Sequence, residues 1–303
     1  MSPNRSKILF ILLFFFSFII NLYYGPMNLS FSDFTSLFYE EHLSFSSKII
    51  WQVRLPRLLC AFLCGGALSA SGTIAQGIFR NPLASPSIMG TTSGATLATV
   101  IAFYSHVAFN HWFVLPLYSF LGAFLVTAFI FIYLKKNSQQ DLDSLVLVGF
   151  SISALLHGIS SLIINVASSN TEHLSLIFRW QMGGLSGCGK QQFILAFLPI
   201  CAGWLLGRKT LYSLDLFSLG PDLAKSVGID TTKLHLKVIC ATALMVGGVV
   251  SIAGAVSLVG LIIPHITRKI LGPRHKSLYI FATLNGMSFL AICDLASKTI
   301  IAP

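Results

Sequence analysis

The stretch GGLSGCGKQQ, residues 183–192, holds the residue types in this chain that come closest to a nucleotide-binding motif. From Gly184 it reads G-x-x-x-x-G-K, which matches a phosphate-cradling P-loop up to its last position. That position needs a Ser or Thr hydroxyl for Mg²⁺, and here it is Gln191. A P-loop also needs a buried strand before it and a helix after it whose N-terminus holds the phosphate.

The cysteines and one histidine are the other candidates for chemistry. The six cysteines are scattered, and none forms a C-x-x-C pair. Cys60 and Cys64 share a helix face, but no His or second pair completes a metal site, so packing explains them better. His157 lies inside an otherwise uncharged apolar run, where an ionisable group is a functional candidate. A neutral imidazole bonded to a backbone carbonyl is the alternative.

The composition indicates which elements must position these residues. Hydrophobic residues make up 54% of the chain and charged residues 10%, against about 25% charged in an ordinary soluble domain. Long uncharged runs match the hydrocarbon layer of a bilayer, where only helices and closed barrels satisfy the backbone. We predict an all-α polytopic transmembrane helix bundle, a single transmembrane domain over residues 1–303, without a cofactor or a metal.

The interruptions between the apolar runs predict about nine spans. They lie at roughly 8–24, 56–78, 88–104, 116–134, 145–167, 193–207, 236–253, 258–271 and 277–297. The eighth is short, as in a helix that starts below the membrane surface or is broken by Pro264. No small-x-small cleavage site follows the first run, so we interpret it as a span and not as a signal peptide.

The cations predict the orientation. With the N-terminus inside, six of the 20 Lys and Arg residues fall in outer segments, namely Lys48, Arg54, Arg57, Arg179, Lys190 and Lys298. The other 14 fall in inner segments, as the positive-inside rule requires. The net charge of +10 therefore indicates contact with anionic lipid and not with nucleic acid. The stretch 183–192 lies on the outer face, away from ATP, so we interpret its glycines as a tight outer turn.

Small and polar residues recur inside the spans. Gly65, Ser69 and Thr73 follow small-x-x-x-small spacing, which lets helix backbones approach closely in lipid. Tight bundle packing explains most of them, and a set of helices around a conduit is the functional alternative. Three amides are candidates either for lining a conduit or for bonding a neighbouring helix: Gln76, Asn165 and Asn285.

Three stretches carry a resemblance to a known family. They are WQVRLPRLLCAFLCGGALSASGTIAQGIFRNPLASPSIMGTTSGA from residue 51, LFSLGPDLAKSVGI from residue 216, and AGAVSLVGLIIPHITRKILGPRHK from residue 253. Together they resemble the permease subunits of bacterial ABC importers for iron-siderophore, haem and cobalamin. The resemblance implies that this chain forms a dimer, with a second copy or with a paralogue, in the cell inner membrane. It also implies two cytoplasmic ATPase subunits and a periplasmic binding protein that delivers the chelate.

The resemblance also assigns roles to residues. The inner loop at about 208–234 resembles the segment that couples such a permease to its ATPase. Its predicted coupling residues are Leu216, Leu219, Gly220, Leu223, Ala224, Val227 and Gly228. The four apolar side chains among them fall at helical spacing, and exposed apolar residues there need a protein partner. An amphipathic helix resting on the inner leaflet is the alternative.

Arg54 and Arg57, in R-L-P-R, match residues that meet carboxylates of the binding protein, and Lys298 stands where the family often has another Arg. Asn81, Pro82 and Leu83 match a loop that narrows the path on the inner side. Asp143 lies where the cobalamin permease has small hydroxyl residues, so it is either part of a second narrowing or a solvated turn.

The resemblance implies ten spans in the family, and we expect about nine in this sequence, without the tenth. The leading interpretation is an iron-chelate permease, with haem or cobalamin as the alternative substrate. A secondary transporter, or a membrane enzyme using His157 and His265, is the alternative from another class, although no paired carboxylates supply a proton relay.

Overall fold

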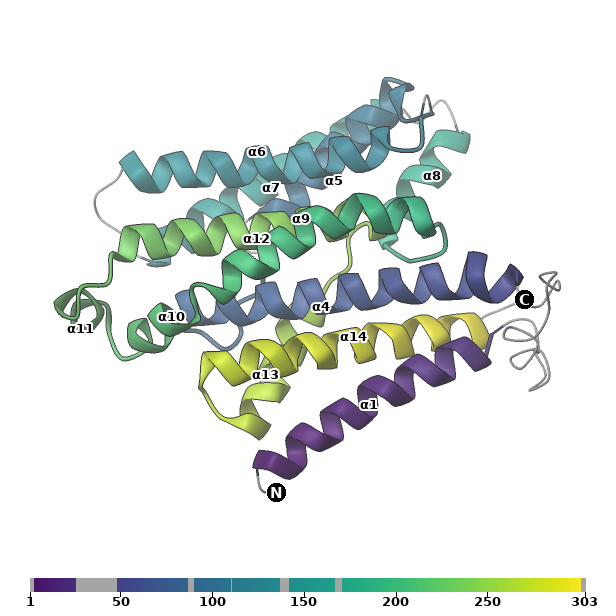
Figure 1. The fold of residues 1–303 in the computed structure, drawn as a ribbon. Helices are drawn as coiled ribbons and strands as arrows, with labels where there is room; N and C mark the ends of the chain where they lie inside the picture. Colours follow the sequence, from purple (N-terminus) through teal and green to yellow (C-terminus); the bar gives the residue numbers. More distant parts are fainter. Residues whose placement is uncertain are drawn as a thin grey trace.

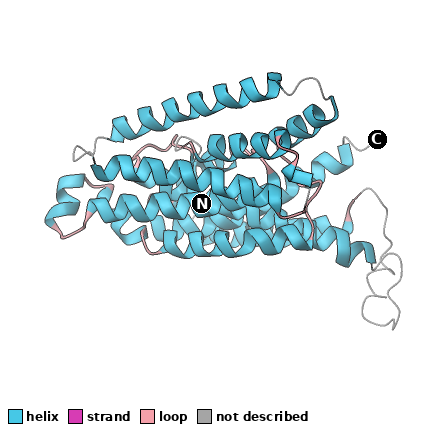
Figure 2. Ribbon diagram, turned by 90° about the horizontal axis from the view of Figure 1, so that it is seen from above, coloured by secondary structure: helices cyan, strands magenta, loops and turns pink. Residues whose placement is uncertain are grey.

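The computed structural model describes residues 3–25, 48–86, 90–109, 111–136, 142–166 and 171–300. Within these ranges all regular secondary structure is helical (Figures 1 and 2). The α-helices are α1 (Pro3–Tyr23), α4 (Leu55–Ile78), α5 (Thr91–Tyr104), α6 (Val114–Lys136), α7 (Leu142–Val166), α8 (Thr171–Met182), α9 (Lys190–Arg208), α10 (Leu211–Phe217), α11 (Pro221–Ser226), α12 (Thr231–Ala253), α13 (Val259–Leu271) and α14 (His275–Ile300). A π-helical turn, η1 (Ile50–Arg54), leads into α4, and a 3₁₀ turn, η3 (Val107–Phe109), follows α5.

Nine of these helices coincide with the nine predicted spans. Six helical stretches are long and apolar enough to cross a membrane: α1, α4 with its lead-in, α7, α9, α12 and α14. α6 has a shorter apolar stretch, Val114–Ile130, while α5 and α13 have 14 and 13 residues and fall short of the roughly 20 needed to span alone. The prediction of a polytopic helix bundle is confirmed.

α13 is short because it starts inside the bundle. Its first turn lies against the C-terminal half of α4, since a Cβ added at Gly72 would collide with the Gly260 carbonyl. The chain between α12 and α13 is irregular, and Leu258 caps α13 with a φ of +69°. Pro264 lies within α13 without interrupting it, so the late start of the helix, and not a break at the proline, accounts for the short span.

α4 forms the centre of the molecule. In Figure 1 it lies between α9 and α14, and α1 packs on the far side of α14. Small residues make this possible, because a Cβ added at Gly65 or Gly286 would strike the backbone of the other helix. The predicted close approach through small-x-x-x-small spacing is confirmed for these helices.

Two local features go beyond the sequence patterns. α8 is a helix outside the nine predicted spans, because its acidic and basic residues keep it below the hydropathy of a span. The helical spacing of Leu216, Leu219, Leu223 and Val227 does not run through one helix: the stretch forms α10 and α11, because Gly220 has a φ of +140° and Pro221 starts a new helix.

Candidate functional site

We call the end of the bundle where α4 begins and α14 finishes the outer end, after the predicted orientation, and the opposite end the inner end. Functional candidates gather at three places: the outer ends of α1, α4 and α14, a pocket between α7 and α8, and the loops of the inner end.

At the outer end, Arg57 and Lys298 share one carboxylate. The Arg57 guanidinium donates from Nε to both oxygens of Asp294, each at 3.1 Å, and from Nη2 to Oδ1 at 2.8 Å. Lys298 Nζ pairs with the other side of the same carboxylate. The Asp294 side chain is only 5% exposed, so two cations from α4 and α14 neutralise a nearly buried anion.

Arg54 bonds backbone carbonyl oxygens of α1. Its Nη1 donates to the carbonyl oxygens of Leu22 at 2.7 Å and Tyr23 at 2.8 Å. These carbonyls belong to the last turn of α1, which has no further helical N–H to bond. The guanidinium therefore fastens the end of α1 to the start of α4, and its positive charge suits the negative end of that helix dipole.

These cations line one recess of about 260 Å³, together with Asn21 and Tyr24. The structure thus brings together the three predicted docking residues, Arg54, Arg57 and Lys298. Among the residues that the structure describes, three cations and one carboxylate leave the recess net positive. Asp294 was missed as a site residue, although its place four residues before Lys298 on the last span is an ion-pair spacing that could have found it.

A polar pocket of about 440 Å³ lies between α7 and α8. His157, Ser161 and Asn165 line it from one face of α7, and Gln181 lines it from α8. Most side chains of α7 are exposed in the isolated chain, although the helix is apolar enough to span a membrane. Among the described residues no hydrogen bond to the His157 ring occurs, so the alternative of an imidazole bonded to a carbonyl finds no support.

The three amides separate into two roles. Gln76 donates from Nε2 to the Leu261 carbonyl of α13 at 3.1 Å, and Asn285 donates to Thr267 Oγ1 of the same helix at 3.0 Å. Both therefore bond neighbouring helices. Asn165 lines the α7–α8 pocket instead.

The inner end carries two loops. In the first, the Asn81 side chain accepts a hydrogen bond from the Leu83 N–H at 2.8 Å, which closes a turn that leaves Asn81, Pro82 and Leu83 exposed. Asp143 is in the first turn of α7, and its side chain lies outside the part of the chain that the structure describes.

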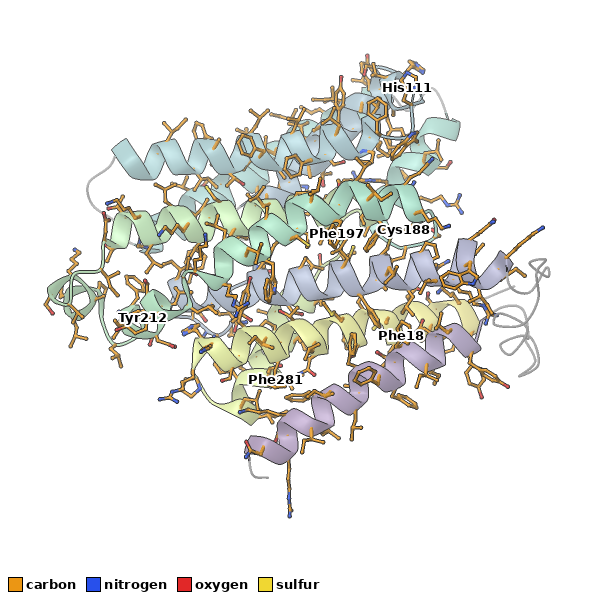
Figure 3. All side chains as sticks on the ribbon, in the orientation of Figure 1. Phe18, His111, Cys188, Phe197, Tyr212 and Phe281 are labelled. Carbon is orange, nitrogen blue, oxygen red and sulfur yellow. The ribbon has the colours of Figure 1, made fainter. Side chains whose placement is uncertain are left out.

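The second loop is α10–α11. Leu219, Leu223 and Val227 are exposed by 70%, 48% and 58%, and Leu216 is half-buried. Ala224 is buried and anchors α11 on the molecule. Gly220 and Gly228 frame α11 with positive φ angles of 140° and 86°. Figure 3 shows Tyr212 of α10 at the same end of the bundle.

A contact missed from the sequence anchors this loop. Asp215 of α10 accepts two hydrogen bonds from His275, the first residue of α14, from the backbone N at 2.9 Å and from Nδ1 at 2.7 Å. The carboxylate thereby caps the N-terminus of α14. Sixty residues separate the partners, so no local spacing could have indicated the pair.

The stretch 183–192 is not a phosphate cradle. The helix α8 precedes it, where a P-loop needs a strand. Gly184 N donates to the Ala253 carbonyl at 2.8 Å, and Leu185 and Cys188 are buried. The glycines form a packed turn before α9, in which Gly183 has a φ of +70°.

A bundle of membrane-length helices, with a polar pocket on an exposed helix and an apolar loop at one end, is typical of a multi-pass membrane protein. The profile of the FecCD transport family matches residues 11–303. The chain belongs to this family and is a permease subunit of the ABC importer type. This assignment replaces the secondary-transporter and membrane-enzyme alternatives.

Individual relatives are also permeases of import systems. The chain is 34% identical to the iron(3+)-hydroxamate import system permease protein FhuB of Bacillus subtilis, over 88% of this chain and 69% of the relative. It is 32% identical to the molybdate import system permease protein MolB of Haemophilus influenzae, over 84% and 74%. A solved inward-facing structure of a metal-chelate type ABC transporter superposes with a TM-score of 0.87 at 30% identity, over 98% of this chain and 91% of that one.

Proposed function

We propose that this permease forms the translocation path for an iron chelate. A periplasmic binding protein delivers the chelate to the outer end, and ATP is hydrolysed by partner subunits at the inner end. The chain works as a dimer with a second copy or a paralogue, in the cell inner membrane, with its N-terminus in the cytoplasm. Haem or cobalamin is the alternative substrate.

The observation that carries the substrate class is the α7–α8 pocket. Its polar groups are hydroxyls, amides and one imidazole, from Ser160, Ser161, Asn165, Gln181 and His157. Hydroxyl, amide and imidazole groups suit the amide, hydroxyl and carboxylate periphery of an organic chelate. A small oxyanion would instead favour fixed cations, and no Lys or Arg is among the residues that line the pocket.

Features at the two ends of the bundle support the proposed ATPase and binding-protein partners. The exposed leucines of α10–α11 need a protein cover on the aqueous side. The net positive recess of Arg54, Arg57 and Lys298 suits carboxylates of a binding protein, because opposite potentials steer association. Asn81, Pro82 and Leu83 are exposed at the inner end and are proposed to narrow the path there, and Asp143 is proposed to belong to a second narrowing.

Uptake tests this function. The chain, its ATPase and its binding protein are expressed in a strain that lacks its own chelate uptake, and labelled ferric hydroxamate, ferric citrate, haem, cobalamin and molybdate are offered in parallel. We expect saturable, ATPase-dependent uptake of a ferric chelate, reduced by a Gln181→Ala or Asn165→Ala change. Uptake of molybdate alone, or of cobalamin alone, would show that the substrate is wrong.

A further inference from the structure

An apolar groove opens between α9 and α14, with α4 as its floor. We call it the α9–α14 groove. Its volume is about 470 Å³ and its lining is almost entirely apolar. The groove is deep because the residues of α4 at its base, Gly66 and Ala67, are small. Phe197 and Met287 border the groove toward the outer end. Figure 3 shows Phe197 on α9 above α4.

In the described lining of the groove, only the Cys201 thiol, a weak donor, is left for a polar ligand. The one side-chain hydroxyl in its lining, that of Thr283, donates to the Tyr279 carbonyl at 2.7 Å and accepts from Trp204 Nε1 at 3.3 Å. Both walls continue into exposed apolar side chains, including Leu205 of α9 and Ile280 of α14. An apolar chain at the depth of the hydrocarbon layer fits this surface, since an unfilled groove would forfeit dispersion contacts along its walls.

Two cations border the inner end of the groove. Arg208 follows Trp204 by one helical turn on α9, and its guanidinium carbon lies 5.7 Å from the centre of the Trp204 ring. Lys276 precedes Ile280 by one turn on α14, and both cations are exposed. The groove residues of α9 run from Phe197 to Leu205, which is about 12 Å of helix at 1.5 Å per residue. An apolar groove of that length matches an acyl chain, and the two cations one turn beyond it match a phosphate. Together they are complementary to an anionic phospholipid.

We propose that the α9–α14 groove holds one acyl chain of an anionic phospholipid, whose phosphate lies between Arg208 and Lys276. The inference rests on the membrane-spanning assignment and is independent of the transported substrate. A specific lipid there would fill the space between α9 and α14 beside the central helix, next to the α10–α11 loop that follows Arg208.

Photolabelling tests the acyl chain. The full-length permease is reconstituted in phosphatidylcholine vesicles with a small fraction of phosphatidylglycerol that carries a diazirine in its acyl chain. We expect label on the groove residues of α4, α9 and α14. Cys201→Phe, which fills the groove from the α9 wall, should lower this label at least about fivefold, since the slot holds little more than one chain. Leu198→Phe is the matched control, because Leu198 is 74% exposed and is not among the residues that line the groove.

Headgroup competition tests the charge. Either Arg208→Gln or Lys276→Gln alone should lower the preference for phosphatidylglycerol over phosphatidylcholine about fivefold, because each removes one cation near the membrane surface. The two changes together should lower this preference more than tenfold. Lys237→Gln, an exposed lysine of α12, should leave the preference unchanged.

Three results would overturn the proposal. One is label spread evenly over α9 and unchanged by Cys201→Phe, which would indicate ordinary boundary lipid. Another is absence of label from the groove in the assembled transporter, which would show that a protein covers it. The third is a headgroup preference that the double cation change does not move. If Cys201→Phe fails to insert, Ile280→Trp blocks the groove from the opposite wall and serves the same comparison.

Discussion

Arg54, Arg57 and Lys298 were predicted as docking residues, and at the scale of single side chains Arg54 and Arg57 also join neighbouring helices. Arg57 and Lys298 neutralise the nearly buried Asp294, and Arg54 ties the end of α1 to α4. A charge reversal at Arg54 would place a carboxylate beside backbone carbonyls. Such a change would disturb folding before it could report on docking, so the two roles must be separated residue by residue.

Replacing Arg54 by Gln should lower stability by about 1–3 kcal/mol, because two carbonyls at the end of α1 lose a charged donor. The measurement is thermal unfolding of the detergent-solubilised protein. Lys298→Gln is the control for fold, since Asp294 keeps its two-pronged contact with Arg57. It should be nearly as stable as the wild type and should bind the binding protein more weakly. Equal stability of the Arg54→Gln variant and the wild type would contradict the anchoring role.

At the scale of elements, the α10–α11 loop is both exposed and fixed. Ala224 and the buried face of α10 attach it to the bundle, and Asp215 joins it to the first residue of α14. Its outward side presents leucines. The α10–α11 loop is fixed to the bundle on one side and exposes apolar side chains on the other. Such an element is suited to transmit a movement of the ATPase to the bundle.

Leu219→Asp and Leu223→Asp should each prevent co-purification of the ATPase, because an unpaired charge buried at a protein contact costs several kcal/mol. The permease itself should still insert and fold, since both side chains are exposed in the isolated chain. Ser226→Asp is the matched control, because it adds the same charge to α11 at an exposed polar position. Full co-purification and uptake in both leucine variants would favour a helix resting on the membrane.

Asp215→Ala should lower stability by about 1–3 kcal/mol, because the His275 N–H and ring lose their shared acceptor. It should also reduce chelate-stimulated ATP hydrolysis more than basal hydrolysis, since α10 is no longer fixed to α14. Asp215→Asn keeps an acceptor oxygen and should restore part of both. A variant that matches the wild type in stability and in stimulated hydrolysis would show that the contact carries no coupling.

At the scale of the whole molecule, packing depends on small residues at helix crossings. Gly286 of α14 faces Ser69 and Gly65 of α4 so closely that a Cβ has no room. In a bilayer the hydrophobic effect does not drive helices together, so such close approach supplies much of the attraction.

Gly286→Leu should therefore lower stability by about 3 kcal/mol or more, because overpacking at a backbone contact cannot be relieved by a side-chain movement. The yield of folded protein on size-exclusion chromatography and its unfolding temperature are the measurements. Gly158→Leu on α7 is the control, since a Cβ added there would meet no described atom within 4 Å other than its chain neighbours and the backbone of its own helix. Similar losses in both variants would point to a general intolerance of leucine in these helices.

The sequence by itself determined the class of fold, the places of the spans, the close packing around Gly65 and the exposed leucines of the inner loop. These follow from local properties, namely the length of apolar runs, the spacing of small residues and the periodicity of leucines. Family motifs added the residues of the outer recess.

Only the tertiary structure decided which groups meet. Arg57 and Asp294 are 237 positions apart in the chain, and Asp215 and His275 are 60 apart, so their pairing depends on how whole helices pack. The same holds for the α7–α8 pocket and the α9–α14 groove, whose walls come from separate helices. Side chains far apart in sequence become neighbours only when backbone approach is fixed, and in this protein small residues at the crossings of α4 fix it.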